Sequence, residues 1–335
     1  MSSDCPIVSL DVLEGVYASI RSYIQETPLL ESPSLSELTG GKVWVKAESL
    51  QITGAFKFRG ALYRLTQLSP AEKNKGVAAY SSGNFACGLA KAGQILNIPV
   101  HLVMPHNAPD NKIASAKGLG AVVMLCHASR PSREEAANIM ATHVAKEEGY
   151  TLLHPFDDPI LVKGQATVGI ELQQQLAALG QSCHHLLCPA GGGSLVAGCS
   201  LIFLPERTNT QVYSVEVEGF DGMRQSLAKG KLTRAAGQQK SHCDALLAVS
   251  PGQATFQIAR HTHVKGLTVR ELSVKKALRL AFTELHLVLE PSGAVAIGAI
   301  IEHPERFSQQ NTVVVASGGN VDIATYQNLL KEQNT

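Results

Sequence analysis

Short Val-rich apolar runs alternate along this chain with amphipathic stretches of helical period, and this alternation limits the fold more than any other feature. Parallel strands need crossover helices between them, and strands covered on both faces carry few polar residues. We therefore predict an α/β fold with a parallel sheet. The predicted strands cover residues 42–46, 76–80, 99–104, 121–126, 185–190, 212–217 and 312–316, and the predicted helices cover 11–24, 57–67, 84–96, 133–146, 162–179, 274–285 and 321–330.

The chain has 335 residues, and at about 150 residues per domain this length predicts two domains. Residues 76–150 form a self-contained succession of strands and helices, whereas the units on either side are longer and more loosely patterned. We predict a small domain over residues 76–150 that is inserted in a large domain built from 1–75 and 151–335. Residues 230–253 are predicted to form a loop.

Composition and charge argue against several classes of function. Lys and Arg number 29 and Asp and Glu 28, so the net charge is +1 and no basic run is present to attract nucleic acid. The longest uncharged stretch, residues 186–205, is interrupted by Pro189 and by glycines, so we expect no membrane span. The first residues do not resemble a secretion signal and the seven cysteines include no CxxC pair, so we expect a cytoplasmic protein with reduced thiols.

A glycine-rich loop, Gly191-Gly192-Gly193-Ser194, separates a predicted strand from a helix-like segment. Consecutive glycines leave the backbone N–H groups open and a helix start attracts negative charge, so this loop is suited to a phosphate group. The spacing is not that of a dinucleotide fingerprint, because Val196 stands where a third glycine would be required. The alternative interpretation is a tight turn with close backbone packing.

Lys57 stands between Phe56 and Phe58 at the start of a predicted helix, two residues before Arg59. Apolar and cationic surroundings both lower the pKa of an amine, which makes this lysine a candidate to form a Schiff base. The alternative is an ordinary solvated lysine on a helix surface.

Two further junctions between a strand and a helix carry polar side chains. Ser81, Ser82 and Asn84 follow the predicted strand 76–80, where the N–H groups of a helix start would hold a carboxylate, although Ser and Asn are also ordinary N-caps. The segment 317–320, which reads Ser-Gly-Gly-Asn, follows the predicted strand 312–316 and indicates that another group approaches the backbone closely.

Together these four motifs resemble the serine/threonine dehydratase and serine racemase branch of the fold-type II pyridoxal phosphate enzymes, over about residues 27–322. The segments 27–29, 155–159, 164–169 and 290–294 match the same branch. The resemblance implies two open, twisted, mostly parallel sheets flanked by helices, as in the tryptophan synthase β subunit. It also implies pyridoxal 5'-phosphate at the domain interface, with residues 1–75 and 151–335 as the large cofactor-binding domain and residues 76–150 as the small substrate-side domain, and a homodimer.

The resemblance implies a role for each matching residue. Lys57 would form the Schiff base, Ser317 would face the pyridine nitrogen and Asn84 would bind the pyridine hydroxyl. The cofactor phosphate would be held by Gly191, Gly192, Gly193 and Ser194. The substrate carboxylate would be bound by Ser81, Ser82 and the backbone N–H of Phe85, with Arg133 nearby on the substrate side. Phe85 replaces the usual histidine, so we expect its ring to alter the carboxylate pocket.

The activity implied is conversion of L-threonine or L-serine to a 2-oxo acid and ammonia, with Lys57 as the base that takes the Cα proton. Racemisation of serine stays open, because Ser82 would offer an acid or base on the opposite face of Cα and racemase-like relatives carry Ser there. Dehydration of 3-hydroxyaspartate also stays open, as does a pyridoxal phosphate binding protein without turnover. Each of these functions implies a small amino acid as the partner.

Racemase-like relatives hold a Mg²⁺ or Ca²⁺ ion, and Glu216 matches one of the oxygen ligands. The second expected acid falls on Gly222, with Asp221 one position away, so Glu216 is alternatively a cap for the next helix. We interpret the Cys and His residues of segment 183–188 as part of a buried strand rather than as a zinc site.

Overall fold

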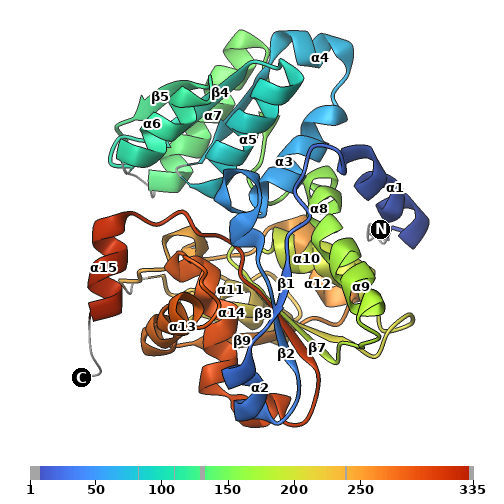
Figure 1. Ribbon diagram of the computed structural model, residues 1–335. Helices are drawn as coiled ribbons and strands as arrows, with labels where there is room; N and C mark the ends of the chain where they lie inside the picture. The colour runs from blue at the N-terminus through green and yellow to red at the C-terminus, as the bar shows by residue number, and fades with distance from the viewer. Residues whose placement is uncertain (1–7, 82, 109, 129–132, 238–239, 332–335) are drawn as a thin grey trace.

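The computed structural model describes residues 8–81, 83–108, 110–128, 133–237 and 240–331, and it confirms the predicted α/β class (Figure 1). Two sheets stand one above the other. The larger has the strand order β1 (Leu29–Glu31), β2 (Val43–Lys46), β10 (Thr312–Val315), β7 (His185–Pro189), β8 (Gln211–Val217) and β9 (Lys265–Val269). The smaller has the order β5 (Val122–Cys126), β4 (Val100–Pro105), β3 (Val77–Tyr80) and β6 (Thr151–Leu153).

All strand pairs are parallel except that of β1 with β2, so almost every connection is a helical crossover. The helices of the upper part are α3 (Lys57–Thr66), α4 (Pro70–Lys75), α5 (Asn84–Leu96), α6 (Asp110–Gly118) and α7 (Arg133–Glu148). Those around the larger sheet are α1 (Leu10–Ile20), α2 (Pro33–Thr39), α8 (Pro159–Gln165), α9 (Thr167–Ala178), α10 (Ser194–Ile202), α11 (Gly222–Lys229), α12 (Gln253–His261), α13 (Glu271–Thr283), α14 (Pro291–Glu302) and α15 (Ile323–Lys331). Short 3₁₀ turns are η1 (Glu48–Leu50), η2 (Ile52–Gly54), η3 (Asp244–Leu246) and η4 (Pro304–Phe307).

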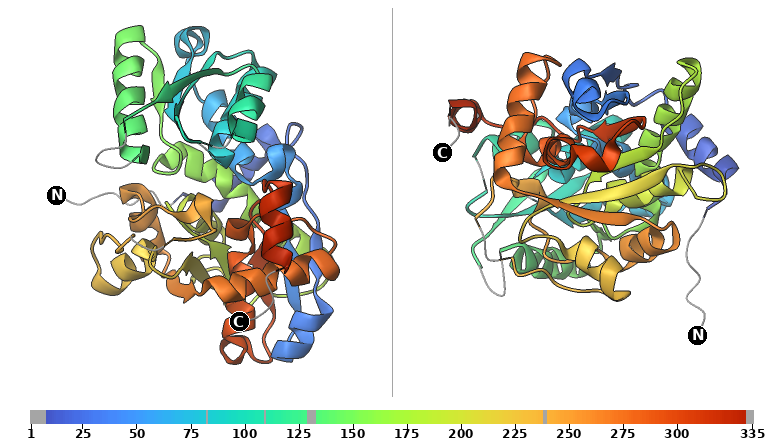
Figure 2. Two further views of the ribbon diagram at one scale, coloured as in Figure 1. Left: turned by 90° about the vertical axis from the view of Figure 1, so that its left-hand side faces the viewer. Right: turned by 90° about the horizontal axis from the view of Figure 1, so that it is seen from below.

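The strands of the larger sheet bury side chains on both faces, with the period of two that a strand imposes. Leu187 packs into the apolar cluster formed with α13 and α14, whereas its neighbours Leu186 and Cys188 pack into the cluster formed with α9, α10 and α12. The view from below in Figure 2 shows helices on both sides of this sheet. Cys188 and His185 are both buried in β7, which confirms that segment 183–188 contributes to a core strand.

The core beneath the smaller sheet extends beyond the predicted small domain. Phe58 and Leu62 of α3 belong to the same buried cluster as Leu89 of α5 and Leu102 of β4. The fourth strand, β6, begins at Thr151, one residue past the predicted boundary. Because the four strands of the smaller sheet all come from residues 77–153, we keep the division into two domains as a proposal.

All seven predicted strands are present, but the predicted helix 162–179 is two helices, α8 and α9, which meet at Ala166. Three strands were not predicted, because β1 and β6 have only three residues each and β9 mixes Lys and Thr with apolar residues. Helix α14 was also missed: it is apolar on every face and wholly buried over residues 291–300, so no amphipathic period marks it. In the described part of the predicted loop 230–253, η3 is the one helical turn before α12 begins at Gln253.

None of the helices in the described part of the chain has the length and apolarity that a bilayer crossing requires.

Candidate active site

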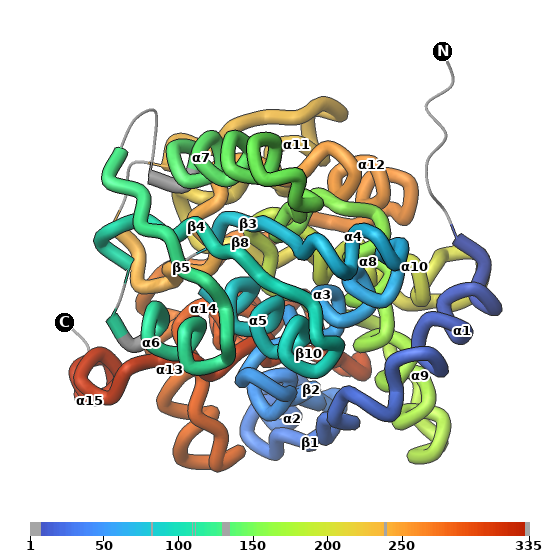
Figure 3. Tube along the Cα trace, turned by 90° about the horizontal axis from the view of Figure 1, so that it is seen from above, coloured from blue at the N-terminus to red at the C-terminus, as the bar shows by residue number. Residues whose placement is uncertain are grey.

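The four predicted motifs lie at the carboxyl ends of parallel strands, where loops from several strands meet. Lys57 starts α3 shortly after β2, Asn84 starts α5 after β3, Ser194 starts α10 after β7, and Ser317 follows β10. Helices α3 and α5 share one apolar cluster and lie next to each other in the view from above in Figure 3. Ser82 and the side chain of Arg133 lie outside the described residues, so these two predictions stay untested.

The amine of Lys57 points at the glycine-rich loop. Its Nζ donates to the carbonyl oxygen of Pro155 at 2.8 Å and to Ser194 Oγ at 3.3 Å, and it lies 5.2 Å from the centroid of the Phe56 ring. Although the residue as a whole is half-buried, burial of the amine end lowers the pKa of Lys57 to about 7. At neutral pH a large fraction of this amine is therefore unprotonated and nucleophilic.

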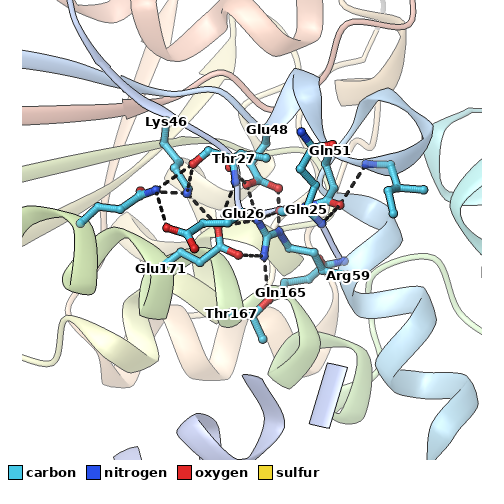
Figure 4. A network of polar contacts seen from close by, with 12 residues as sticks. Gln25, Glu26, Thr27, Lys46, Glu48, Gln51, Arg59, Gln165, Thr167 and Glu171 are labelled. Atoms are coloured by element: carbon cyan, nitrogen blue, oxygen red, sulfur yellow. Dashed lines mark hydrogen bonds and ion pairs between the residues drawn. The ribbon is translucent and has the colours of Figure 1, made fainter. Parts of the chain in front are cut away.

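The lowered pKa was predicted, and of its two expected causes burial applies whereas a neighbouring cation does not. Arg59 adds no repulsion at Lys57, because its guanidinium turns away into a buried cluster of charges (Figure 4). The ring of Phe58 also points elsewhere, into the core beneath the smaller sheet. Desolvation alone accounts for the lowered pKa of Lys57.

The buried cluster anchors the start of α3. Arg59 donates to both oxygens of Glu48 at 2.8 and 2.7 Å and to both oxygens of Glu171 at 2.7 and 2.8 Å. Lys46 Nζ reaches Glu171 Oε2 at 2.8 Å and the carbonyl oxygen of Thr27 at 2.7 Å. The four charged side chains are fully buried and balance one another. Burial opposes ionisation of Glu171, but the bonds and charge of Arg59 outweigh it and lower the pKa of this carboxyl.

The glycine-rich loop is built so that no side chain fits there. A Cβ at Gly192 would lie 2.1 Å from Cγ of Phe156, and Gly193 has a φ of 91°, which a residue with a side chain rarely adopts. The carbonyl of Gly192 is turned away from the loop, since it accepts from Thr255 Oγ1 at 2.7 Å. The loop is therefore a tight turn and also presents its N–H groups at the start of α10, as an anion site requires.

The junction after β3 places its predicted residues in different surroundings. Ser81 Oγ accepts from the backbone N–H of Gly83 at 3.3 Å, and Asn84 is buried as the first residue of α5. Phe85 is buried in the apolar cluster of α3 and α5 rather than in a polar pocket. Our expectation that its ring alters the carboxylate pocket is therefore wrong. Ala86 N and Cys87 N donate to the carbonyl oxygen of Gly83 at 3.0 and 3.4 Å, so within the described residues the N–H groups of Asn84 and Phe85 are the ones at this helix start that remain free to bind an anion.

The junction after β10 is joined to the segment before Lys57. Phe56 N donates to the carbonyl oxygen of Ser317 at 3.2 Å, and Ala55 forms an antiparallel bridge with Gly318. A Cβ at Gly318 would lie 3.1 Å from Asn84 Nδ2, so this loop also contacts α5. Lys57, Asn84, Ser194 and Ser317 are thus brought to one place, as predicted.

Sequence reasoning missed the contribution of the segment that follows β6. His154 Nδ1 accepts from Asp157 N at 2.9 Å, and its Nε2 lies 3.1 Å from the hydroxyl of Tyr80, the residue before Ser81. Burial, more than the charge of Lys57, lowers the pKa of His154. The next residue, Pro155, supplies the carbonyl that binds Lys57. The family match over residues 155–159 was the signal that pointed to this segment.

Glu216 is a helix cap and lies at a separate place. Its two oxygens accept from the backbone N–H groups of Met223 and Arg224, each at 2.8 Å, at the start of α11. Among the described residues there is no group of three or more His, Cys, Asp or Glu side chains able to hold a metal ion. The capping alternative accounts for Glu216, and we assign it no role as a cation ligand.

The site residues fit pyridoxal phosphate on two observations of this structure. The first is a buried amine with a pKa of about 7, which is able to react with an aldehyde. The second is the loop that this amine faces, where neighbouring side chains exclude a Cβ at Gly192 and Gly193, so that only backbone groups line the loop at these positions. Ser194 then contributes both its place at the helix start and a hydroxyl 3.3 Å from Lys57 Nζ.

Comparisons with known proteins agree with this site. A family model described as pyridoxal-phosphate dependent enzyme matches residues 20–318. A catabolic L-threonine dehydratase of Staphylococcus aureus is 32% identical over 331 residues, which cover 97% of this chain and 92% of the relative. Among solved structures, a threonine deaminase of T.th. is 38% identical, with a TM-score of 0.87 over 94% of this chain and 99% of that one. A maize serine racemase is 30% identical, with a TM-score of 0.88 over 97% and 98%. The chain therefore belongs to the family of pyridoxal-phosphate dependent enzymes.

Proposed function

We propose that this chain converts L-threonine, L-serine or both to the corresponding 2-oxo acid and ammonia, with pyridoxal phosphate as cofactor. The observation that carries the proposal is the Lys57 amine, which has a pKa of about 7 and lies against the glycine-rich loop. The similarity to a threonine dehydratase and a threonine deaminase supports the choice of substrate.

Each candidate residue has a specific task in this proposal. Gly191, Gly192, Gly193 and Ser194 would hold the phosphate through backbone N–H groups, with Asn84 at the ring oxygen and Ser317 at the ring nitrogen. Pyridoxal phosphate, when bound, supplies an electron sink for the charge that develops at Cα of the substrate. A hydroxyl at the ring nitrogen favours a protonated ring less than a carboxylate would, and this suits loss of a β-hydroxyl.

Lys57 Nζ would take the Cα proton. A general base works best when its pKa lies near the working pH, and burial places the pKa of Lys57 at about 7. The acceptors Pro155 O and Ser194 Oγ support this role because they fix the direction of the amine. The substrate carboxylate would lie at the start of α5, bound by Ser81, Ser82 and the N–H of Phe85, with Arg133 nearby.

The test is an assay of 2-oxo acid and ammonia with L-threonine and L-serine, on wild-type protein and on Lys57→Ala. We expect turnover with the wild type and a loss of at least about 10³-fold in kcat in Lys57→Ala, because base and nucleophile are removed together. Lys229→Ala, an exposed lysine of α11, is the matched control and should retain wild-type activity. Dehydratase activity in Lys57→Ala would refute the proposal.

Racemisation of serine is the second candidate, since the maize serine racemase aligns over nearly the whole chain. Chiral chromatography of the same L-serine incubations separates the two, because D-serine that forms faster than pyruvate would reverse the order of the candidates. If 3-hydroxyaspartate alone is turned over, the assigned substrate changes from threonine or serine to 3-hydroxyaspartate. If the cofactor binds and none of these amino acids is turned over, the protein is a pyridoxal phosphate binding protein and not an enzyme for them.

We also propose that the protein works as a homodimer in the cytoplasm. Phe282 of α13 and Ile323 of α15 are large apolar residues that remain exposed in the single chain, which supports an apolar contact between two copies. The described cysteines are all free thiols, which supports a reducing compartment. Sedimentation and cell fractionation test these two points.

A further inference from the structure

A directed chain of hydrogen bonds runs behind the proposed cofactor site and joins four segments that are distant in the sequence. Asn320 Nδ2 donates to the carbonyl oxygen of Thr53 at 2.8 Å and to Asn84 Oδ1 at 2.9 Å. Asn84 Nδ2 in turn donates to Glu290 Oε1 at 2.5 Å. Thr53 lies in η2, Asn84 begins α5, and Glu290 is the N-cap of α14.

The direction of this chain is set at its first member. A main-chain carbonyl only accepts hydrogen bonds, so the group of Asn320 that faces Thr53 has to be the NH₂. The same NH₂ faces Asn84, which therefore presents its side-chain oxygen to Asn320. The NH₂ of Asn84 is then turned to the opposite side, where the carboxyl group of Glu290 accepts from it.

The backbone at Thr53 is held in an unfavourable conformation that gives its carbonyl this position. Thr53 has a φ of 65° and a ψ of 15°, and a left-handed conformation is rare and costly for a β-branched residue. Gly54 follows with a φ of 73°, and a Cβ there would lie 2.5 Å from Asn320 Oδ1. Gly319 N donates to the Gly54 carbonyl at 2.9 Å, which pins the two loops together.

At the Glu290 end of this chain of hydrogen bonds, one N–H of the Asn84 amide is still unused. An amide NH₂ carries two hydrogens, and one of them is used by Glu290 Oε1. Glu290 is itself buried, and within the described residues its other oxygen has no hydrogen-bond partner. The second N–H of Asn84 therefore remains for a group outside this chain of bonds.

We propose that Thr53 and Asn320 are positioning residues, which orient the Asn84 amide so that its second N–H points to the ring oxygen of bound pyridoxal phosphate. The inference rests on the proposed function, which gives Asn84 that contact. An ionised ring oxygen is attracted by an N–H and repelled by an amide oxygen, so the orientation decides whether the contact binds or repels. Loss of one such charge-assisted bond lowers affinity about 10- to 100-fold.

The experiment compares Asn320→Asp with Asn311→Asp. The first variant replaces the donor NH₂ with an oxygen, and the second does the same to an asparagine at the other end of β10, whose NH₂ donates to Gln181 Oε1 and to the carbonyl of Ser182. Three quantities are measured: the Kd for pyridoxal phosphate, the wavelength of the visible absorbance of the loaded protein, and the circular dichroism of the unloaded protein.

We expect Asn320→Asp to raise the Kd about 10-fold or more and to move the visible absorbance, and Asn311→Asp to leave both at wild-type values. If the unloaded Asn320→Asp protein is not folded, Asn320→Ala takes its place, because it removes the donor without adding a charge. An unchanged Kd and an unchanged absorbance in a folded Asn320 variant would overturn the proposal.

Asn84→Ala separates this inference from the proposed function. If Asn84→Ala binds the cofactor as the wild type does, Asn84 has no contact with the ring and that part of the proposed function fails. If Asn84→Ala weakens binding, the double variant with Asn320→Asp decides: we expect the second substitution to add less than about 2-fold, because Asn320 acts through Asn84. Fully additive effects would mean that Asn320 acts independently and would refute its role as a positioning residue.

Discussion

Removal of Arg59 tests the account of the buried charge cluster most directly. Replacement of Arg59 by Met retains an unbranched side chain that fills the space of the aliphatic part of arginine, but it removes the guanidinium. Four hydrogen bonds to carboxylate oxygens are lost, two to Glu48 and two to Glu171. Glu171 keeps Lys46 as a cationic partner at 2.8 Å, whereas Glu48 keeps only the hydroxyl of Thr27 at 2.5 Å. The variant therefore leaves two buried carboxylates against the single cation Lys46, so the cluster carries one uncompensated negative charge.

Loss of one partner from a buried ion pair costs about 3–5 kcal/mol. With an unfolding entropy of about 2.1 cal/mol/K per residue, a chain of 335 residues loses about 4–7 °C of Tm for this amount. The matched control is Arg270→Met, which removes the ion pair between an exposed arginine and Glu302, whose carboxylate keeps its bonds from Ser273 Oγ and the backbone N–H of residue 270, and it should shift Tm by less than about 1.5 °C. Calorimetry with saturating pyridoxal phosphate in every sample measures both shifts, because ligand concentration itself changes Tm.

The loss in Arg59→Met depends on pH in a direction that the structure dictates. Two buried carboxylates that share one cation favour uptake of a proton in the folded variant, whereas a glutamate of the unfolded chain loses its proton near pH 4.3, roughly the ordinary value for Glu. Above that pH the folded variant binds more protons than the unfolded chain, so its stability falls as pH rises. The difference in Tm from the wild type should be smaller at pH 5 than at pH 8.

A double variant decides whether the missing countercharge is the cause. Glu48→Gln by itself leaves two cations against Glu171 and should also destabilise, but in the Arg59→Met background it removes the uncompensated charge. The double variant should therefore lose less stability than the sum of the two single losses, by about 0.5–3 kcal/mol. Additive losses, or a Tm difference that is the same at pH 5 and pH 8, would refute the electrostatic reasoning.

Three further predictions concern the site and its surroundings. Burial raises the pKa of Glu216 to about 8, so the folded wild type loses stability as pH rises from about 4.5 to 8. Glu216→Gln should flatten the plot of Tm against pH over this range, and a plot as steep as that of the wild type would contradict the prediction. Gly192→Ala should raise the Kd for pyridoxal phosphate at least about 10-fold, since its Cβ would overlap the Phe156 ring, whereas Gly15→Ala, with open space around it in α1, should leave the Kd unchanged. In the cofactor-free protein Lys57 should be acetylated at pH 7 faster than exposed lysines such as Lys229, because its pKa is about 7; mass spectrometry that finds Lys57 slower than Lys229 would contradict the assigned pKa.

Much of the site was accessible from the sequence because its signals are local. A strand that ends in glycine or a hydroxyl residue and continues into a helix is readable from about ten consecutive residues, and this pattern located Asn84, Ser194 and Ser317. Lys57 was located from its place between two phenylalanines at a predicted helix start. The expected effect of Phe85 was wrong, because a ring in the first turn of α5 faces either the site or the core according to how the helix is rotated. The packing of α5 on α3 determines that rotation, and no nearby residue does.

The sequence by itself determined the fold class, seven of the ten strands in the described part of the chain and the strand ends that carry function, because the period of side chains along a strand or helix is a property of neighbouring residues. Only the tertiary structure decided the partners: Pro155 O for the Lys57 amine, Glu48 and Glu171 for Arg59, and Asn320 and Glu290 for Asn84. Buried charges and amides have to find partners, but many side chains in the sequence are chemically equivalent candidates. The packing of the two sheets and of the loops at their strand ends brings one of these candidate side chains within hydrogen-bond distance. This packing joins residues that are distant in the sequence, such as Asn84 and Asn320.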